Sequence, residues 1–202
     1  MPENVFRRRL LGAFVAVAVA ATVSTVACPA PAEAAWGYTW THFDNMEPRT
    51  TSQPEDRFFF DTDSSRSSGY FAAIDDPNAV HSGLTAAHVY NSLGGGTFSS
   101  VGKTVTIAPR SAGYWTTCQF NAWINTGRGE ALNIEVIDPV NWTYVTVKRV
   151  TASASYTWQQ VSTAQFNPPP RPVVLRVSYL FGPFATSTGF ATVDDFKLTC
   201  TY

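Results

Sequence analysis

Charged side chains are scarce in this sequence of 202 residues: they make up 14% of it, against about 25% in an average soluble domain. The 14 Lys and Arg nearly cancel the 15 Asp and Glu. Three of the basic and two of the acidic residues lie in the first 34 positions, so the rest of the chain carries a net charge of −2. Nucleic acid requires clustered Lys and Arg to offset its phosphates. We therefore expect no nucleic-acid partner.

Long apolar runs are also few. The run over Leu10–Val19 is too short to be a persuasive membrane span, and no run of spanning length follows it. Arg7–Arg9 precede this run, and Ala32–Ala34 has the small-x-small pattern that signal peptidase accepts. These features predict a signal peptide over residues 1–34. A single secreted domain over residues 35–202 is then expected, without membrane contact after the signal is removed.

Two details of this leader leave alternatives open. Arg7–Leu11 resembles a twin-arginine export motif, so the sequence allows either the general or the twin-arginine route. Cys28 follows small residues near the end of the predicted signal, where a lipoprotein carries its lipidated cysteine. Lipidation of Cys28 is therefore the alternative to a freely secreted protein.

Cysteine is rare beyond the leader, where only Cys118 and Cys200 occur. Two cysteines in an oxidising compartment usually pair. We predict a Cys118–Cys200 disulfide, which would stabilise the fold by about 4 kcal/mol in the chain-entropy model because it closes a long loop.

The motifs of common hydrolases are missing. The sequence has no Gly-x-Ser-x-Gly elbow, and its three histidines are His42, His81 and His88. A zinc site requires closely spaced His, Cys or acidic ligands, and both cysteines of the domain are expected in the disulfide. We therefore expect no enzyme.

Aromatic and neutral polar residues are plentiful, and they alternate along the chain. Aromatics make up 14% of the sequence, and runs of β-branched and aromatic residues with a period of two recur, whereas helical periodicity is hard to find. We predict an all-β fold, a β-sandwich or jelly roll. The expected strands are Lys103–Ala108, Thr116–Asn125, Ala131–Ile137, Thr143–Val150, Thr157–Thr163, Val173–Leu180 and Thr192–Thr201, with Arg57–Tyr70 as an early strand plus a loop.

The strand around Trp123 has two different faces, because side chains alternate between the faces of a sheet. Its apolar face is Cys118, Phe120, Ala122 and Ile124. Its polar face is Gln119, Asn121, Trp123 and Asn125. An aromatic ring flanked by amides suits a sugar, whose C–H face packs on the ring while its hydroxyls bond to the amides. Sugar binding is the functional hypothesis for this face.

Three further residues join this face if their strands are its neighbours. Asn133 and Glu135 point one way from the next strand, and Arg176 points outward from a later one. The alternatives are a merely solvated face, or a Trp123 covered by a terminal segment such as Trp36–Phe43. Trp142, Tyr144 and Trp158 are weaker candidates for ligand contact.

Glycoside cleavage would require two carboxylates across the sugar ring. The Trp123 strand has none and its neighbour offers only Glu135, although a loop residue such as Glu130 or Asp138 would supply a second. A glycoside-active enzyme is the less favoured hypothesis.

The order of several short motifs resembles a known family. They are His81-Ser82-Gly83 with Ala86-Ala87, Phe98–Val105, the Trp123 strand, Tyr156–Ser162 and Val193–Leu198. This order is similar to that of the galactose-binding-like jelly-roll modules of secreted bacterial proteins that bind xylan or glucan. The resemblance implies a non-catalytic, lectin-like module whose ligand lies across a concave sheet face or against the loops at one end. A secreted domain that recognises another protein with the same face, or serves a structural role, is the alternative.

The resemblance also implies a structural calcium ion between acidic residues near both ends of the domain. Asp44 or Glu47, together with Asp194, match those positions. The alternative for Asp194 is a carboxylate that accepts backbone N–H bonds where its strand begins.

Overall fold

Strands make up almost all regular structure in the part of the chain that the computed structural model describes, which is residues 38–48, 57–62, 67–73, 79–91, 98–108, 115–127, 130–180 and 189–202. The strands are β1 (Thr39–Asp44), β2 (Phe59–Thr62), β3 (Ser67–Ala73), β4 (Thr85–Asn91), β5 (Phe98–Val105), β6 (Thr117–Thr126), β7 (Ala131–Asp138), β8 (Thr143–Thr151), β9 (Gln159–Ser162), β10 (Val173–Leu180) and β11 (Gly189–Thr201). All described residues belong to one compact unit, Gly37–Tyr202. The predicted signal peptide over residues 1–34, with Cys28, lies outside the described residues.

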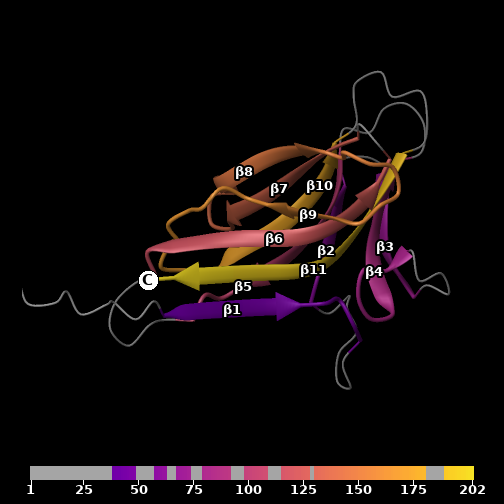
Figure 1. The fold of residues 1–202 in the computed structure, drawn as a ribbon. Coiled ribbons are helices and arrows are strands. Elements are labelled where there is room, and N and C mark those ends of the chain that lie inside the picture. The colour runs from indigo at the N-terminus through magenta and orange to yellow at the C-terminus, as the bar shows by residue number, and fades with distance from the viewer. Residues whose placement is uncertain are drawn as a thin grey trace, which may run out of the picture. The chain divides into compact units, whose positions relative to one another are not determined.

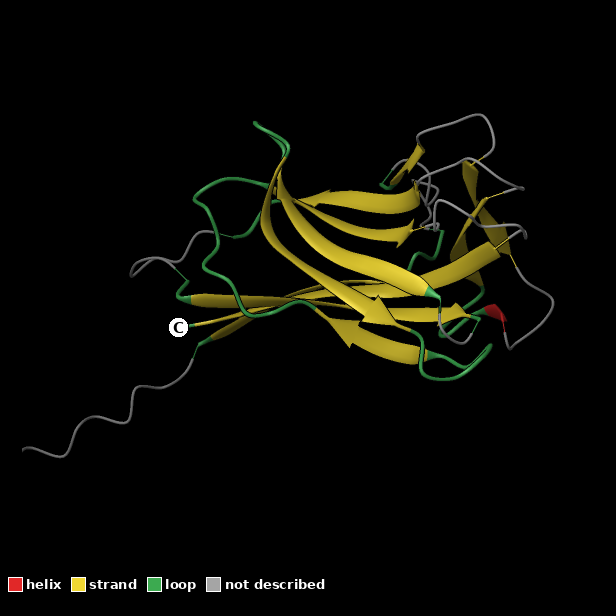
Figure 2. Cartoon of the chain, turned by 90° about the horizontal axis from the view of Figure 1, so that it is seen from above, coloured by secondary structure: helices red, strands yellow, loops and turns green. Residues whose placement is uncertain are grey.

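The strands form two sheets, in which every paired strand runs antiparallel to its neighbour. One is a six-stranded sheet in the order β3-β4-β11-β6-β9, with β1 also paired to β11. The other is a five-stranded sheet in the order β2-β5-β10-β7-β8. Figures 1 and 2 show that strands dominate the described chain. The predicted all-β sandwich is confirmed, and no helix within the described ranges is long and apolar enough to cross a membrane.

β11 holds the six-stranded sheet together. One of its edges pairs with β6 over most of its length. The other edge pairs first with β4, through residues 189–193, and then with β1, through residues 196–201. In Figure 1, β11 therefore lies between β6 and β1.

The core lies between the sheets, and β6 alternates into it as predicted. Cys118, Phe120, Ala122 and Ile124 are at most 1% exposed. Phe120 packs edge-on against Phe196 of β11, with 4.9 Å between ring centroids. The five-stranded sheet contributes Leu132, Ile134, Val136, Leu175 and Val177. The predicted register of β6 is confirmed.

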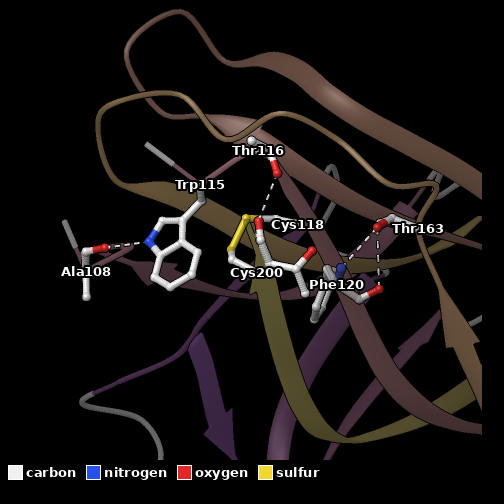
Figure 3. Close-up of a disulfide and its surroundings, with 8 residues drawn as sticks. Ala108, Trp115, Thr116, Cys118, Phe120, Thr163 and Cys200 are labelled. Atoms are coloured by element: carbon white, nitrogen blue, oxygen red, sulfur yellow. Dashed lines mark hydrogen bonds between the residues drawn. A yellow bond between two sulfur atoms is a disulfide. The ribbon is translucent and has the colours of Figure 1, made fainter. Parts of the chain in front are cut away.

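The predicted disulfide joins Cys118 of β6 to Cys200 of β11 across 82 residues of sequence. The two residues are direct partners in the β6–β11 pairing, so the bond links neighbouring strands of one sheet. Figure 3 shows it beside Phe120, whose backbone N–H donates to Thr163 Oγ1 (3.1 Å). The bond is buried in the core, as expected from the apolar face of β6.

Most predicted strands agree with the structure, but β5 begins five residues before the predicted Lys103 and ends three before Ala108, and two strands were not predicted. Val173–Leu180 matches β10 at both ends, whereas β11 begins three residues earlier than expected, at Gly189. The early segment Arg57–Tyr70 spans β2 and the beginning of β3. β1 and β4 were not predicted, and both pair with β11.

Candidate functional site

The amides on the outer face of β6 are largely committed to neighbouring strands. Gln119 Nε2 donates to the Thr163 carbonyl (3.0 Å), and Ser162 Oγ donates to Asn121 Oδ1 (2.5 Å). Asn125 is only 8% exposed and is the register partner of Thr192 on β11. Gln119 and Asn121 thus bind β6 to Ser162, the last residue of β9, and to Thr163, which follows it.

Trp123 is half-buried, and another side chain covers one face of its indole. The His81 imidazole stacks on it, with 3.8 Å between ring centroids and 16° between ring planes. Trp158 packs edge-on against the same imidazole, at 5.6 Å. The cover comes from the His81 turn and not from the terminal segment, because β1 pairs with the edge of β11 that faces away from β6.

Two aspartates on β11 hold the His81 turn in place. The β6–β11 register shifts between Asp194 and Lys197, and Asp195 adopts a φ of 51°. Asp194 accepts the backbone N–H groups of His81 (3.0 Å), Ser82 (3.1 Å) and Asp195 (2.8 Å). Asp195 accepts the Ser82 hydroxyl (2.6 Å), and its other oxygen lies 2.6 Å from His81 Nδ1. Asp194 therefore has the structural role that was the alternative to metal binding.

Burial raises the pKa of Asp194 to about 7. The backbone N–H of Ser82 opposes this rise, and the charge of Asp195 adds to it.

Asp44 lies among cations instead of beside a metal site. Its carboxylate pairs with Arg57 (2.5 Å) and with the ammonium of Lys103, which is itself 8% exposed. It also accepts the Met46 N–H (3.0 Å). Burial alone would raise the pKa of Asp44, but hydrogen bonds from Lys103 and Arg57 outweigh it, so the pKa lies below its ordinary value of 3.8.

The three acidic residues matched to the calcium position do not converge. Glu47 accepts the backbone N–H groups of Leu84 (2.5 Å) and Thr85 (2.8 Å), while Asp44 and Asp194 have the separate partners described above. No group of three or more His, Cys, Asp or Glu within the described ranges is arranged to hold a metal ion. The residues present do not fit a calcium ion, since protein cations and N–H groups already bind their carboxylates.

The other three predicted ligand residues form one network on the outer face of the five-stranded sheet. Arg176 of β10 and Glu135 of β7 are register partners, and Arg176 Nε donates to Glu135 Oε2 (2.5 Å). Glu135 also accepts from Asn133 Nδ2 (3.1 Å) and from the Ser178 hydroxyl (3.1 Å). Asp61 of β2 pairs with the same guanidinium (3.2 Å). We call these five residues the Arg176 network.

The seven predicted ligand residues therefore do not form one surface. Gln119, Asn121, Trp123 and Asn125 belong to the six-stranded sheet, whereas Asn133, Glu135 and Arg176 belong to the five-stranded sheet. The prediction of a joint surface required β6 and β7 to be neighbours. β6 pairs instead with β9 and β11, so that part of the prediction is wrong.

A hollow of about 380 Å³ on the six-stranded sheet was not predicted. It is lined by Tyr70, His88, Tyr90, Gly189 and Phe190. Tyr70 stacks on His88 (5.4 Å, 11°), and Tyr156 stacks on Phe190 (5.9 Å, 24°). The exposed fractions of Tyr70, Tyr90 and Phe190 are 50%, 36% and 42%. We call this site the aromatic hollow.

The sequence carries a signal for this hollow in β4. Ala87 and Val89 alternate with His88 and Tyr90, which is the pattern of a strand with an apolar inner face and an aromatic outer face. Phe190 belongs to the first residues of β11, which lie before the predicted start of that strand. Because β4 was not predicted and β11 was predicted to begin at Thr192, the pairing of β4 with the first residues of β11 that forms the hollow was missed.

The fold has counterparts among solved structures, although no family model and no curated protein matches the sequence. TmCBM61, a family 61 carbohydrate-binding module solved in complex with β-1,4-galactotriose, aligns with a TM-score of 0.53 at 11% identity, over 70% of this chain and 86% of that one. The C-terminal family 22 carbohydrate-binding module of Clostridium thermocellum Xyn10B gives a TM-score of 0.47 at 12% identity, over 79% of this chain and 91% of that one. The similarity to TmCBM61 shows that the chain has the jelly-roll fold of carbohydrate-binding modules, as the order of its motifs predicts.

Proposed function

We propose that this chain is a secreted, non-catalytic module that binds a neutral polysaccharide or glycan on the outer face of the five-stranded sheet. The observation that carries the proposal is the Arg176 network, in which a guanidinium lies between two carboxylates. Such a network holds several hydrogen-bonding groups in fixed directions before a ligand arrives, which reduces the entropy lost on binding.

The chemistry of the network suits sugar hydroxyls, which donate and accept hydrogen bonds. The exposed carboxylate of Asp61 accepts them and the amide of Asn133 does both, whereas the buried Glu135 holds the guanidinium of Arg176 in place. The Asp61 side chain is 42% exposed and so presents its carboxylate to solvent. Tyr144 of β8 is the register partner of Ile137, which lies on the same face of β7 as Glu135. The Tyr144 side chain is 54% exposed, so its ring is available for stacking on a sugar.

The jelly-roll fold supports this proposal, because the structural neighbour TmCBM61 is a carbohydrate-binding module solved with an oligosaccharide. The predicted signal peptide supports secretion, and the small net charge supports a neutral ligand. These features together favour a glycan over a charged polymer.

The absence of catalysis is part of the proposal. A glycosidase places its two carboxylates on opposite sides of the scissile bond. Here Asp61 and Glu135 both pair with Arg176, so the guanidinium occupies the space between them. Asp138, the loop candidate for a second carboxylate, pairs with Arg171 at 2.7 Å.

Affinity gels with xylan, mixed-linked glucan and galactan test the proposal. We expect retardation of the wild-type chain, with a loss of about tenfold or more in affinity for Asp61→Ala and for Tyr144→Ala. Both side chains are exposed enough for the fold to survive. Phe43→Ala is the matched control, because it removes a ring of similar exposure (51%) from the other sheet. Equal loss in all three variants, or no retardation of the wild type, would contradict glycan binding on this face.

Two further measurements separate the alternatives. Release of reducing sugars from the same polysaccharides would show an enzyme. Failure to bind any glycan, combined with specific capture of a purified surface protein through Asp61 and Tyr144, would support the protein-interaction alternative.

A further inference from the structure

The aromatic hollow lies on the opposite side of the sandwich from the Arg176 network. Its walls come from three neighbouring strands: Tyr70 from β3, His88 and Tyr90 from β4, and Phe190 from β11. Tyr70 and His88 are direct register partners, as are Tyr90 and Phe190, so the rings form two adjacent rows on one sheet face. Its volume falls within the range of small-molecule sites.

The residues that line the hollow carry no formal charge. None of them is an acid, lysine or arginine. Burial holds the pKa of His88 below its ordinary value of 6.5, which keeps the imidazole neutral near pH 7. Among the described residues of its lining, a phosphate or carboxylate would therefore find no cation, and a cationic ligand would find no carboxylate. An uncharged ligand with flat apolar faces fits this lining.

The imidazole of His88 distinguishes the hollow from a purely apolar patch. Its Nδ1 lies 3.4 Å from Thr192 Oγ1, while its Nε2 is covered and has no hydrogen-bond partner among the described residues. A phenylalanine would stack equally well on Tyr70 without burying an unsatisfied nitrogen, so packing alone does not account for the histidine. Hydrogen bonding of a ligand to Nε2 requires the half-exposed ring of Tyr70, which stacks on this imidazole, to shift aside. A hydroxyl group satisfies either tautomer, since it both donates and accepts.

We propose that the aromatic hollow is a second glycan-binding site, in which pyranose rings stack on Tyr90 and Phe190 and a hydroxyl group bonds to His88. This inference deepens the proposed function, because it assigns a second site to the same class of ligand. The two sites lie on opposite outer faces, so one molecule bridges two glycan strands. Attachment to a surface rich in glycan is then strengthened by simultaneous engagement.

Aromatic proton–carbon NMR spectra of the purified chain, titrated with xylotetraose, cellotetraose and β-1,4-galactotriose, test the second site. We expect at least one of these sugars to shift the ring signals of Tyr90 and His88 in the wild type. The same shifts should persist in Asp61→Ala, which alters only the Arg176 network. The double variant Tyr90→Ala/Phe190→Ala should lose about tenfold or more in affinity at the hollow. Phe43→Ala removes a ring that is 51% exposed elsewhere on the same sheet and should change nothing.

His88→Phe separates the hydrogen bond from the packing. The variant keeps a ring against Tyr70 but removes Nε2, so we expect about fivefold weaker oligosaccharide binding and unchanged binding of p-cresol. Unchanged oligosaccharide affinity would show that His88 makes no ligand contact. Thermal unfolding of each variant verifies that it is folded.

Bridging has its own readout. The wild type should precipitate a long soluble glycan that contains the bound sugar, whereas Asp61→Ala and Tyr90→Ala/Phe190→Ala should each bind it without precipitation.

The outcomes distinguish this inference from the proposed function. Sugar-induced shifts confined to the Arg176 network would overturn the second site and leave the proposed function standing. Shifts caused by p-cresol or tetramethylammonium but by none of the sugars would overturn the ligand class. Absence of any sugar-induced shift on either face, together with absence of retardation in the gels, would overturn both proposals.

Discussion

Both sheets carry buried carboxylates, but their outer faces differ in the side chains that remain exposed. On the five-stranded sheet, charged side chains are drawn together and buried, so that Glu135 is 1% exposed and bonds to three neighbours. On the six-stranded sheet, the amides fasten β9 and the following residues to β6, while aromatic rings remain exposed around the hollow. The comparison shows that the strands beside an outward-facing residue decide whether it forms ion pairs, holds a neighbouring strand or stays exposed.

The largest expected effect concerns the buried charges. Arg176→Ala leaves Glu135 buried without its cation and should lower the free energy of unfolding by about 3–5 kcal/mol. The double variant Arg176→Met/Glu135→Gln removes both charges and should lose clearly less. Urea denaturation measures both values. Equal losses would show that the pair is not the source of the cost.

The stacked pair on the other sheet predicts a smaller effect. Trp123→Ala removes the ring on which His81 packs and should destabilise the fold by about 2 kcal/mol. Trp142→Ala, at a residue 58% exposed, should stay within about 0.5 kcal/mol of the wild type.

The original hypothesis for Trp123 remains testable with the same variant. If Trp123→Ala has the same unfolding temperature as the wild type but no longer binds glycan, Trp123 anchors the ligand. The glycan site would then lie on the outer face of the six-stranded sheet.

Asp194 and Asp44 should make the stability of the fold depend on pH in opposite directions. Asp194 has a folded-state pKa of about 7, above its ordinary value of 3.8, so between these values the native state binds more protons than the unfolded state. Its contribution to the free energy of unfolding therefore falls as pH rises from about 4 to 7. Asp194→Asn should remove this slope in denaturation curves measured across that range, and an unchanged slope would contradict the assignment.

Asp44 acts in the opposite direction. Its pKa is lowered, so its stabilising contribution is present above pH 3.8 and is lost as the pH falls toward the folded-state value. Lys103→Met should weaken this acid sensitivity, because it removes a cation that favours the charged carboxylate. A wild-type acid transition in this variant would argue against the pairing.

A small effect on stability should accompany a large effect on binding in Asp61→Ala. Asp61→Ala leaves the Arg176–Glu135 pair in place and removes a carboxylate that is 42% exposed, so the unfolding free energy should change by less than about 1 kcal/mol. A larger loss would indicate that Asp61 is structural, and the reduced glycan affinity would then need another explanation.

The alternation within single strands was predictable from the sequence, and the neighbours of each strand were not. The two faces of β6 follow from a period of two, and the pairing of Cys118 with Cys200 follows from their being the only cysteines beyond residue 34. Nothing in that pattern shows that β11 and β9 flank β6 or that β10 flanks β7. The prediction therefore assigned Asn133, Glu135 and Arg176 to the same surface as Trp123, whereas they belong to the other sheet.

The stacking of His81 on Trp123 and the ion pairs of Asp44 were not predicted, because both depend on residues that are distant in the sequence. The stack of His81 on Trp123 depends on hydrogen bonds from residues 81 and 82 to Asp194 and Asp195, which lie more than a hundred positions away. Calcium was inferred from Asp44 by resemblance, whereas Lys103 and Arg57 reach that carboxylate only in the folded chain.

The position of β11 has a consequence for how the molecule is made. This strand is the partner of β1, β4 and β6, although its residues follow all three of them in the sequence. A chain that emerges N-terminus first cannot complete the six-stranded sheet until residues 189–201 are free to insert. A copy that ends before Gly189 would present three strands with unsatisfied edges, which invites aggregation. The six-stranded sheet can therefore form only after β11 has been synthesised.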